Sequence, residues 1–174
     1  MPSELEERFA QGDLEAFETL FRQFQRDVYR WIVRIVRRPD IAEELTVETF
    51  WRIYRAHARF DPSRSFGAWA RRIATNVALG HLERAKSEIA LPDNVAAPHA
   101  GDSAVQSEVR HRIERAFRQL PPDLQVAATL ALIEELPYEE IAQALAIPIG
   151  TVKSRVFRAV RLLRKKLRGF EIRL

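Results

Sequence analysis

Lysine and arginine side chains are concentrated at the carboxyl end of the chain, where they could bind a polyanion. Residues 149–169, IGTVKSRVFRAVRLLRKKLRG, contain eight of these side chains and no acid. Residues 111–174 as a whole carry 12 basic against 7 acidic side chains, whereas residues 1–85 are nearly balanced at 14 against 13. A cationic end on an otherwise balanced protein indicates a polyanionic partner such as nucleic acid.

The basic segment has the pattern of a helix with one apolar and one basic side. At about 100° per residue, the apolar side gathers Val152, Val156, Ala159, Leu163 and Leu167. A shorter helical pattern, YEEIAQAL, precedes it through the turn AIPI, and the basic side lacks acids that would form i,i+4 pairs. These features favour a helix-turn-helix over a merely solvated surface, although a basic helix alone is often no more than that.

In a helix-turn-helix the start of the second helix enters the major groove of duplex DNA. The candidates to reach base edges are Thr151, Lys153, Ser154, Phe157 and Arg158. Arg155 lies among them. The later cations are better placed for phosphates, which supply affinity without sequence information; they are Arg161, Arg164, Lys165 and Lys166.

A second segment interleaves aromatic rings with arginines around a turn-rich loop at residues 61–65. The rings are Trp51, Tyr54, Phe60, Phe66 and Trp69, and the cations are Arg52, Arg55, Arg59, Arg64, Arg71 and Arg72. Cations beside rings or small pockets that accept unstacked bases are typical of single-stranded nucleic-acid binding. Periodicity alone equally allows Tyr54, Phe66 and Trp69 to be core residues.

The elements that must position these residues are all expected to be helices. Apolar residues recur at three- and four-residue steps in three runs before residue 88, and Ser65 is a plausible N-cap for the third. Residues 89–107 are small and polar, which predicts a flexible linker. No stretch alternates with period two. The 174 residues therefore predict an all-α protein with two small helical domains, 1–88 and 108–174.

Several classes of function find no support in the composition. The chain has no cysteine, so disulfides and thiolate metal sites are excluded. His57, His81, His99 and His111 lack metal-ligand spacing, and neither a phosphate-binding glycine loop nor a catalytic grouping is present. We therefore expect no enzyme activity, no metal and no cofactor. The acidic start MPSELEERF and the short apolar stretch VAATLALI predict a cytoplasmic protein without membrane insertion.

At these motifs the chain resembles bacterial sigma factors of the extracytoplasmic-function (ECF) branch of the sigma-70 family. AEELTVETFWRIYR resembles the region-two helix that docks on the RNA polymerase clamp, and FDPSRSFGAWARRIATNVALGHLER resembles the segment that melts and reads the minus-10 element. LPPDLQVAATLALIEELPYEEIAQALAIPIGTVKSRVFRAVRLLRKKL resembles region four, which reads the minus-35 element and touches the polymerase flap. The similarity covers roughly residues 13–85 and 108–168.

The resemblance implies three groups of functional residues. The minus-35 set is Thr151, Lys153, Ser154, Arg155, Phe157, Arg158, Arg161 and Lys165. The minus-10 set, whose loop would capture a flipped-out base, is Phe60, Asp61, Ser63, Arg64, Ser65, Phe66, Trp69, Arg71, Arg72 and Asn76. The polymerase set, which would face the clamp, is Glu44, Glu48, Thr49 and Arg52. Trp69 would lie either at the edge of the melting surface or beneath it.

Three positions depart from the family pattern. Val47 replaces a frequent glutamine, and Gly80 replaces a frequent aspartate within a helix. Ala146 stands in the turn where glycine is usual, so a positive φ there would cost about 1–2 kcal/mol.

The resemblance implies a promoter-specificity subunit that binds core RNA polymerase and promoter DNA, both as a duplex and as a melted strand, under the control of an anti-sigma factor. A free-standing helix-turn-helix regulator is the alternative. Such a regulator would need the C-terminal DNA-binding motif but not the aromatic and arginine-rich loop.

Overall fold

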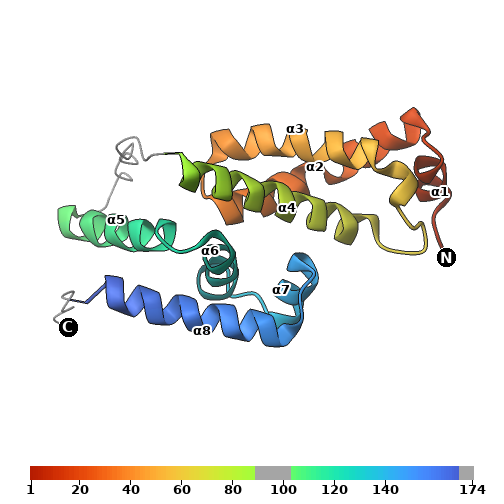
Figure 1. The fold of residues 1–174 in the computed structure, drawn as a ribbon. Helices are drawn as coiled ribbons and strands as arrows, with labels where there is room; N and C mark the ends of the chain where they lie inside the picture. Colours follow the sequence, from red (N-terminus) through yellow and green to blue (C-terminus); the bar gives the residue numbers. More distant parts are fainter. Residues whose placement is uncertain (89–102, 169–174) are drawn as a thin grey trace.

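The computed structural model describes residues 1–88 and 103–168, and every regular element in these ranges is helical (Figure 1). The N-terminal lobe contains α1 (Glu4–Ala10), α2 (Leu14–Val36), α3 (Pro39–Arg55), the 3-10 turn η1 (His57–Arg59) and α4 (Phe66–Ser87). The C-terminal lobe contains α5 (Ala104–Arg118), α6 (Pro122–Ala128), the π-helical turn η2 (Thr129–Ile133), α7 (Tyr138–Leu145) and α8 (Ile149–Lys166). The prediction of an all-α protein with two helical lobes is confirmed.

Local capping chemistry sets several of the helix starts. Ser65 accepts a hydrogen bond from the amide of Ala68 at 3.2 Å, which confirms it as the N-cap of α4. Ser103 and Gln106 form a capping box that starts α5 at Ala104. The predicted linker was therefore too long at its carboxyl end, because residues 104–107 are helical; its remaining part, 89–102, lies outside the described residues.

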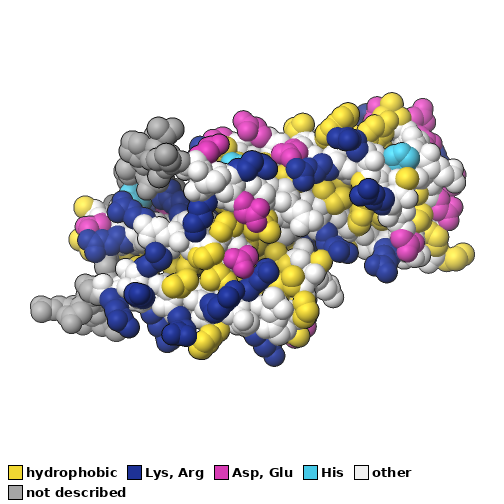
Figure 2. All heavy atoms as spheres, viewed as in Figure 1, with side chains coloured by type: hydrophobic (Ala, Val, Ile, Leu, Met, Phe, Trp, Pro, Cys, Tyr) yellow, Lys and Arg dark blue, Asp and Glu magenta, His cyan; other side chains and the backbone are white. Residues whose placement is uncertain are grey.

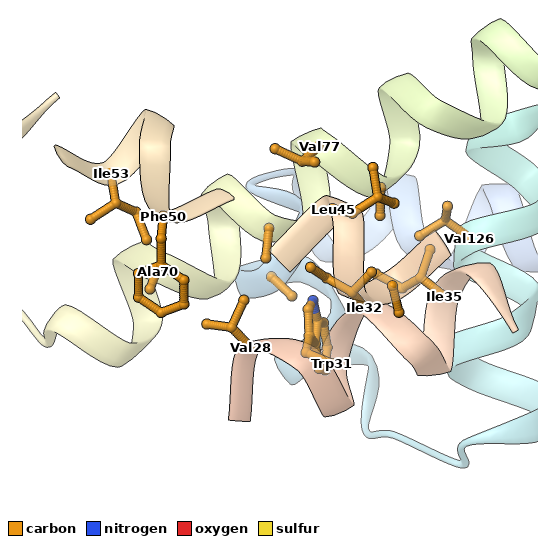
Figure 3. Packing of buried hydrophobic residues seen from close by; sticks show 14 of the residues in the cluster. Val28, Trp31, Ile32, Ile35, Leu45, Phe50, Ile53, Ala70, Val77 and Val126 are labelled. Atoms are coloured by element: carbon orange, nitrogen blue, oxygen red, sulfur yellow. The ribbon is translucent and has the colours of Figure 1, made fainter. Parts of the chain in front are cut away.

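The core of the N-terminal lobe lies between α2, α3 and α4, which pack side by side. The apolar stripe of α2 turns inward, and its residues meet those of α3 and α4 in one cluster (Figure 3). The central buried side chains are Val28, Trp31, Ile32, Ile35, Leu45, Phe50, Ile53, Ala70 and Val77. Their burial supplies the main driving force that holds the three helices together.

The two lobes are packed against each other, and their apolar residues form one continuous cluster. Helices α6 and α7 lie between α4 and α8 (Figure 1). The residues that the C-terminal lobe adds to the cluster are Val126, Ala127, Leu130, Ile141, Ala144, Val152 and Val156. Val126 of α6 lies beside Ile35 of α2 in Figure 3. A smaller cluster, centred on Leu120, Leu124 and Leu163, joins α5, α6 and α8.

Charged contacts flank this apolar interface. Glu134, with a side chain only 18% exposed, lies 3.0 Å from Arg37 and 3.4 Å from Arg34 of α2. Near the C-terminal end of α4, the Lys86 ammonium donates to the backbone carbonyl of Leu120 at 2.9 Å. The sequence predicted two lobes, and the structure adds that they are in contact.

The turn between α7 and α8 contains a left-handed residue. Ala146 has φ 54° and ψ 44° at the C-cap of α7, and the amide of Ile147 donates to the carbonyl of Ala142. Residues with a Cβ are disfavoured in this conformation. The positive φ on which the expected cost at Ala146 depended is therefore present.

We expect the substitution Ala146→Gly to stabilise the protein. The left-handed conformation costs alanine about 1–2 kcal/mol. The greater freedom of glycine in the unfolded chain offsets roughly 0.5–1 kcal/mol of this gain. The net rise in the free energy of unfolding, about 0.5–1 kcal/mol, is measured by urea denaturation followed by circular dichroism. The control Ala144→Gly, in the same helix but with ordinary helical geometry, should lower stability; equal effects of the two substitutions would contradict the assignment of strain.

Candidate nucleic-acid interface

Helix α8 presents its basic side to solvent because its apolar side is buried against the rest of the C-terminal lobe. Val152, Val156, Ala159 and Leu163 are buried, as the helical pattern predicted. The exposed members of the minus-35 set are Lys153, Ser154, Phe157, Arg158, Arg161 and Lys165. Thr151 and Arg155 are half-buried. Figure 2 shows Lys and Arg side chains gathered along α8 and the neighbouring α5.

An acid that the sequence analysis did not single out faces two of these arginines. Asp123 is in the first turn of α6, and its carboxylate lies 3.7 Å from Arg155 Nε and 4.0 Å from an Arg158 guanidinium nitrogen. This carboxylate attracts both guanidinium groups in the absence of DNA. Asp123 is more than 30 residues away from both arginines in the sequence, so no local spacing could predict these contacts.

The loop between η1 and α4 exposes a short polar tip. Asp61, Ser63, Arg64 and Ser65 are exposed. The Ser63 hydroxyl and amide donate to Asp61 Oδ1 at 2.7 and 3.0 Å, and these bonds hold the pKa of Asp61 below its ordinary value. The tip is therefore a compact turn with an ionised carboxylate, next to the Arg64 guanidinium at 3.6 Å.

Two rings predicted to serve this loop in base capture are instead core residues. Phe60 is 4% exposed and Phe66 is 1% exposed, so neither presents its face to a nucleotide in this conformation. Trp69 is half-buried beneath the loop, with its ring centroid 5.0 Å from that of Phe60. For Phe66, the core position that periodicity also allowed is the one observed. Phe60, a member of the minus-10 set, is buried as well, and both rings close the core at this end of the lobe.

The remaining members of the minus-10 set lie on α4. Arg72 and Asn76 are exposed and four residues apart, so they share one face of the helix. Arg71 is half-buried and forms an ion pair with Glu140 of α7 at 3.2 Å. Arg71 is therefore engaged by the other lobe, which sequence periodicity could not reveal.

Arg71 is also fixed from the side of the core. Its guanidinium carbon lies 4.5 Å from the centroid of the Trp31 ring, a cation–π contact. The indole N–H of Trp31 donates to the Thr75 hydroxyl at 2.9 Å, and that hydroxyl donates to the backbone carbonyl of Arg71 at 2.7 Å. This buried network ties the position of Arg71 to the packing of α2 against α4.

The polymerase set is only partly accessible on α3. Glu44 and Arg52 are exposed, and half-buried Glu48 forms an ion pair with Arg52. Thr49 is fully buried and donates its hydroxyl to the Leu45 carbonyl, so its predicted contact with a partner is wrong in this conformation. Two large apolar side chains, Val47 and Trp51, are exposed on the same helix.

The described surface is suited to the recognition of a polyanion. Within residues 1–88 and 103–168, no group of three or more His, Asp or Glu side chains is placed to hold a metal ion. In the same ranges, no helix has the length and apolar composition that crossing a bilayer requires. What the described surface offers is a cationic helix on one lobe and a polar loop beside exposed Arg72 and Asn76 on the other.

Comparisons with protein families match both lobes. The family described as Sigma-70 region 2 matches residues 20–88, and the family described as Sigma-70, region 4 matches residues 110–163. The first match covers the loop and α4, and the second covers the helix-turn-helix through most of α8.

Relatives align over nearly the whole chain. RNA polymerase sigma-H factor of Pseudomonas aeruginosa is 35% identical, with 94% of this chain and 92% of the relative covered. ECF RNA polymerase sigma-E factor of Haemophilus influenzae is 33% identical, with 94% and 93% covered. ECF RNA polymerase sigma factor SigW of Bacillus subtilis is 30% identical, with 90% and 91% covered.

Two solved structures share the fold. CnrH, solved with the cytosolic domain of CnrY, has a TM-score of 0.59 at 22% identity, covering 95% of this chain and 96% of CnrH. The sigma factor RpoE of Bartonella quintana, solved with the anti-sigma factor NepR, has a TM-score of 0.55 at 22% identity, covering 90% and 99%.

We expect the hydroxyl of Thr75 to be needed for the network that holds Arg71. Thr75→Val keeps the shape of the side chain but leaves the buried Trp31 N–H without its acceptor, which should lower the free energy of unfolding by about 1–3 kcal/mol. Thr75→Ser retains the hydroxyl and serves as the control. Chemical denaturation followed by tryptophan fluorescence measures both; a loss in Thr75→Val no larger than that in Thr75→Ser would contradict the assigned role of the hydrogen bond.

Proposed function

This chain belongs to the sigma-70 family as an RNA polymerase sigma factor of the ECF type, and from that membership we propose how its two lobes divide promoter recognition. The C-terminal lobe reads the minus-35 element as duplex DNA. The N-terminal lobe binds core polymerase and holds the minus-10 element after the strands part. The observation that carries this division is the location of the cationic face of α8 and the exposed loop at residues 61–65 on separate lobes.

On the C-terminal lobe, the first turns of α8 enter the major groove. Lys153, Ser154 and Arg158 are exposed there and can donate to base edges. Phe157, which is also exposed, is suited to an apolar contact such as a thymine methyl group. Arg161 and Lys165 lie further along the helix and contact phosphates, so they contribute affinity that depends on salt.

On the N-terminal lobe, the loop tip takes the flipped-out base and α4 guides the strand beside it. Asp61, Ser63 and Ser65 offer hydrogen-bonding groups at the tip, whereas Phe60 and Phe66 support it from below. Arg72 and Asn76 face solvent on α4 and meet the neighbouring nucleotides.

The polymerase clamp is proposed to bind the exposed side of α3. Glu44 and the Glu48–Arg52 pair supply polar contacts, and exposed Val47 and Trp51 supply the apolar area that buried Thr49 cannot. A mixed surface with an aromatic anchor is typical of protein interfaces. The departure at Val47 therefore replaces a polar contact by an apolar one.

The two lobes have to separate for both promoter elements to be engaged. Elements about 25 base pairs apart lie roughly 85 Å from each other at about 3.4 Å per base pair. A compact chain of this length has a radius of gyration of only about 16 Å. The arrangement in which the lobes pack against each other is accordingly the form that an anti-sigma factor in the cytoplasm would retain. The sigma factor RpoE, which shares the fold, was solved in complex with the anti-sigma factor NepR.

The proposal is tested with the purified chain, core polymerase and a library of duplex fragments. The holoenzyme should select fragments that share two elements, and permanganate should detect unpaired thymines near the downstream one. The isolated chain should retain few fragments. Tight selection by the isolated chain, without polymerase association or strand opening, would instead support a free-standing regulator.

Arg158→Ala should reduce discrimination at the minus-35 element by about 1–3 kcal/mol if the guanidinium contacts a base edge. Lys165→Ala is the matched control on the same helix, and it should weaken binding to all sequences alike and lower the salt slope by about 0.9. Holoenzyme binding to selected and mutated duplexes, measured over a range of salt concentrations, separates the two effects. A uniform loss for Arg158→Ala would assign it to phosphate instead.

Neutralising the acids at the interface between the lobes should favour their separation. The double variant Glu134→Gln, Glu140→Gln removes three ion pairs, each worth roughly 0.2–1 kcal/mol. We expect a larger radius of gyration in small-angle X-ray scattering at low salt. Glu108→Gln, which disrupts an ion pair within α5, is the control and should leave the radius unchanged. An unchanged radius in the double variant would show that the lobes stay together without these ion pairs.

A further inference from the structure

Three buried rings join the two ends of the loop that bears residues 61–65. Phe60 precedes the loop, Phe66 follows it, and Phe9 comes from α1, far away in the sequence. The ring centroids of Phe9 lie 5.7 Å from Phe60 and 5.4 Å from Phe66, and those of Phe60 and Phe66 lie 5.6 Å apart. All three side chains are at most 4% exposed, and their tilted or edge-to-face contacts are the favoured aromatic geometries.

Helix α1 holds Phe9 firmly in this triangle. Ser3 and Glu6 form a capping box at its start, and Arg8 pairs with Asp13 at 2.8 Å after its end. The chain then turns at Gly12, whose φ of +89° favours glycine. A Cβ at this position would meet the His57 ring at 3.0 Å, so α1 lies close against η1.

A polar contact joins α1 directly to the segment that leads into the loop. His57 Nδ1 lies 3.1 Å from the carbonyl oxygen of Ala10, which accepts its hydrogen bond. The Phe9 ring also packs edge-on against His57 at 6.4 Å and against Trp69 at 6.2 Å. Phe9 therefore contacts residues before, at both ends of and after the loop.

The loop tip has few other means to fix its orientation. The hydrogen bonds of its own backbone and side chains are local: Ser63 and Arg64 donate to Asp61, and Ala68 and Trp69 donate to Ser65. Such bonds define the shape of the turn but not where it points. The direction of the tip relative to Arg72 and Asn76 on α4 is set by the rings at its base.

We propose that Phe9 is a positioning residue for promoter reading, because it closes the base of the minus-10 loop and so aims residues 61–65 at the captured nucleotide. This inference rests on the proposed function of that loop. Phe9 lies outside residues 20–88, which the region 2 family matches, so the assignment comes from its contacts. Recognition groups must be held within about 0.5 Å of their productive position to be effective.

The test uses the full chain with Phe9→Leu in complex with core polymerase. Duplex fragments randomised over the minus-10 element are selected in competition, and unpaired thymines are mapped with permanganate. We expect discrimination at the captured base to fall roughly ten- to a hundredfold, as for other small misplacements of recognition groups. Affinity for core polymerase and preference at the minus-35 element should stay within about twofold of the wild type, since α3 and α8 are unchanged.

Phe50→Leu is the matched control for lost stability. Phe50 is also buried in the N-terminal lobe, but its ring pairs with Phe21 at 4.8 Å rather than with the loop. If Phe9→Leu loses no more minus-10 discrimination than Phe50→Leu, the inference is overturned. Phe9→Met, which is flexible enough to fill more of the site, gives the same comparison at a smaller cost in stability.

The wild-type holoenzyme separates the inference from the function on which it rests. A wild type that shows no preference for any base in the minus-10 element would overturn the proposed role of the loop, and the inference with it. A wild type that discriminates, together with a Phe9→Leu variant that behaves as Phe50→Leu does, would overturn the inference alone.

Discussion

The burial of one apolar cluster across both lobes is the constraint on which the rest of the arrangement depends. Side chains from α2, α3 and α4 share this cluster with others from α6, α7 and α8, so neither lobe hides its apolar surface alone. Ala127 and Ala144 are small enough to let the helices approach closely. The polar contacts follow from that approach, since Glu134 and Glu140 meet arginines only because the helices already touch.

The proposed functional groups lie on the exposed sides of elements whose other sides are buried in the core. The burial of the apolar side of α8 leaves Lys153 and Ser154 exposed toward solvent, together with Arg158, which lies 4.0 Å from the Asp123 carboxylate. In the N-terminal lobe, the rings of Phe60 and Phe66 are buried in the core. The polar loop tip between them remains exposed to solvent. The same segment thus supplies both support and recognition.

Much of this could be predicted from the sequence because it depends on local patterns. The two sides of α8, the N-cap at Ser65 and the left-handed Ala146 each follow from a few neighbouring residues. The burial of Phe66 was one of two positions that its helical pattern allowed. The burial of Phe60 and Thr49 could not be predicted, since a ring or hydroxyl on a short helical pattern carries no sign of its distant neighbours. Long-range pairs such as Arg71 with Glu140, 69 residues apart, leave no spacing to detect.

The π-helical turn η2 determines the direction of the Glu134 side chain at the interface between the lobes. The amide of Glu134 donates to the carbonyl of Thr129, five residues earlier, where an α-helix would bond four residues back. Such a turn accommodates one extra residue, and each residue rotates a helix by about 100°. Deleting a single residue from Thr129–Ile133 would therefore swing Glu134 away from Arg34 and Arg37. The attachment between the lobes is in this sense sensitive to chain length as well as to side-chain identity.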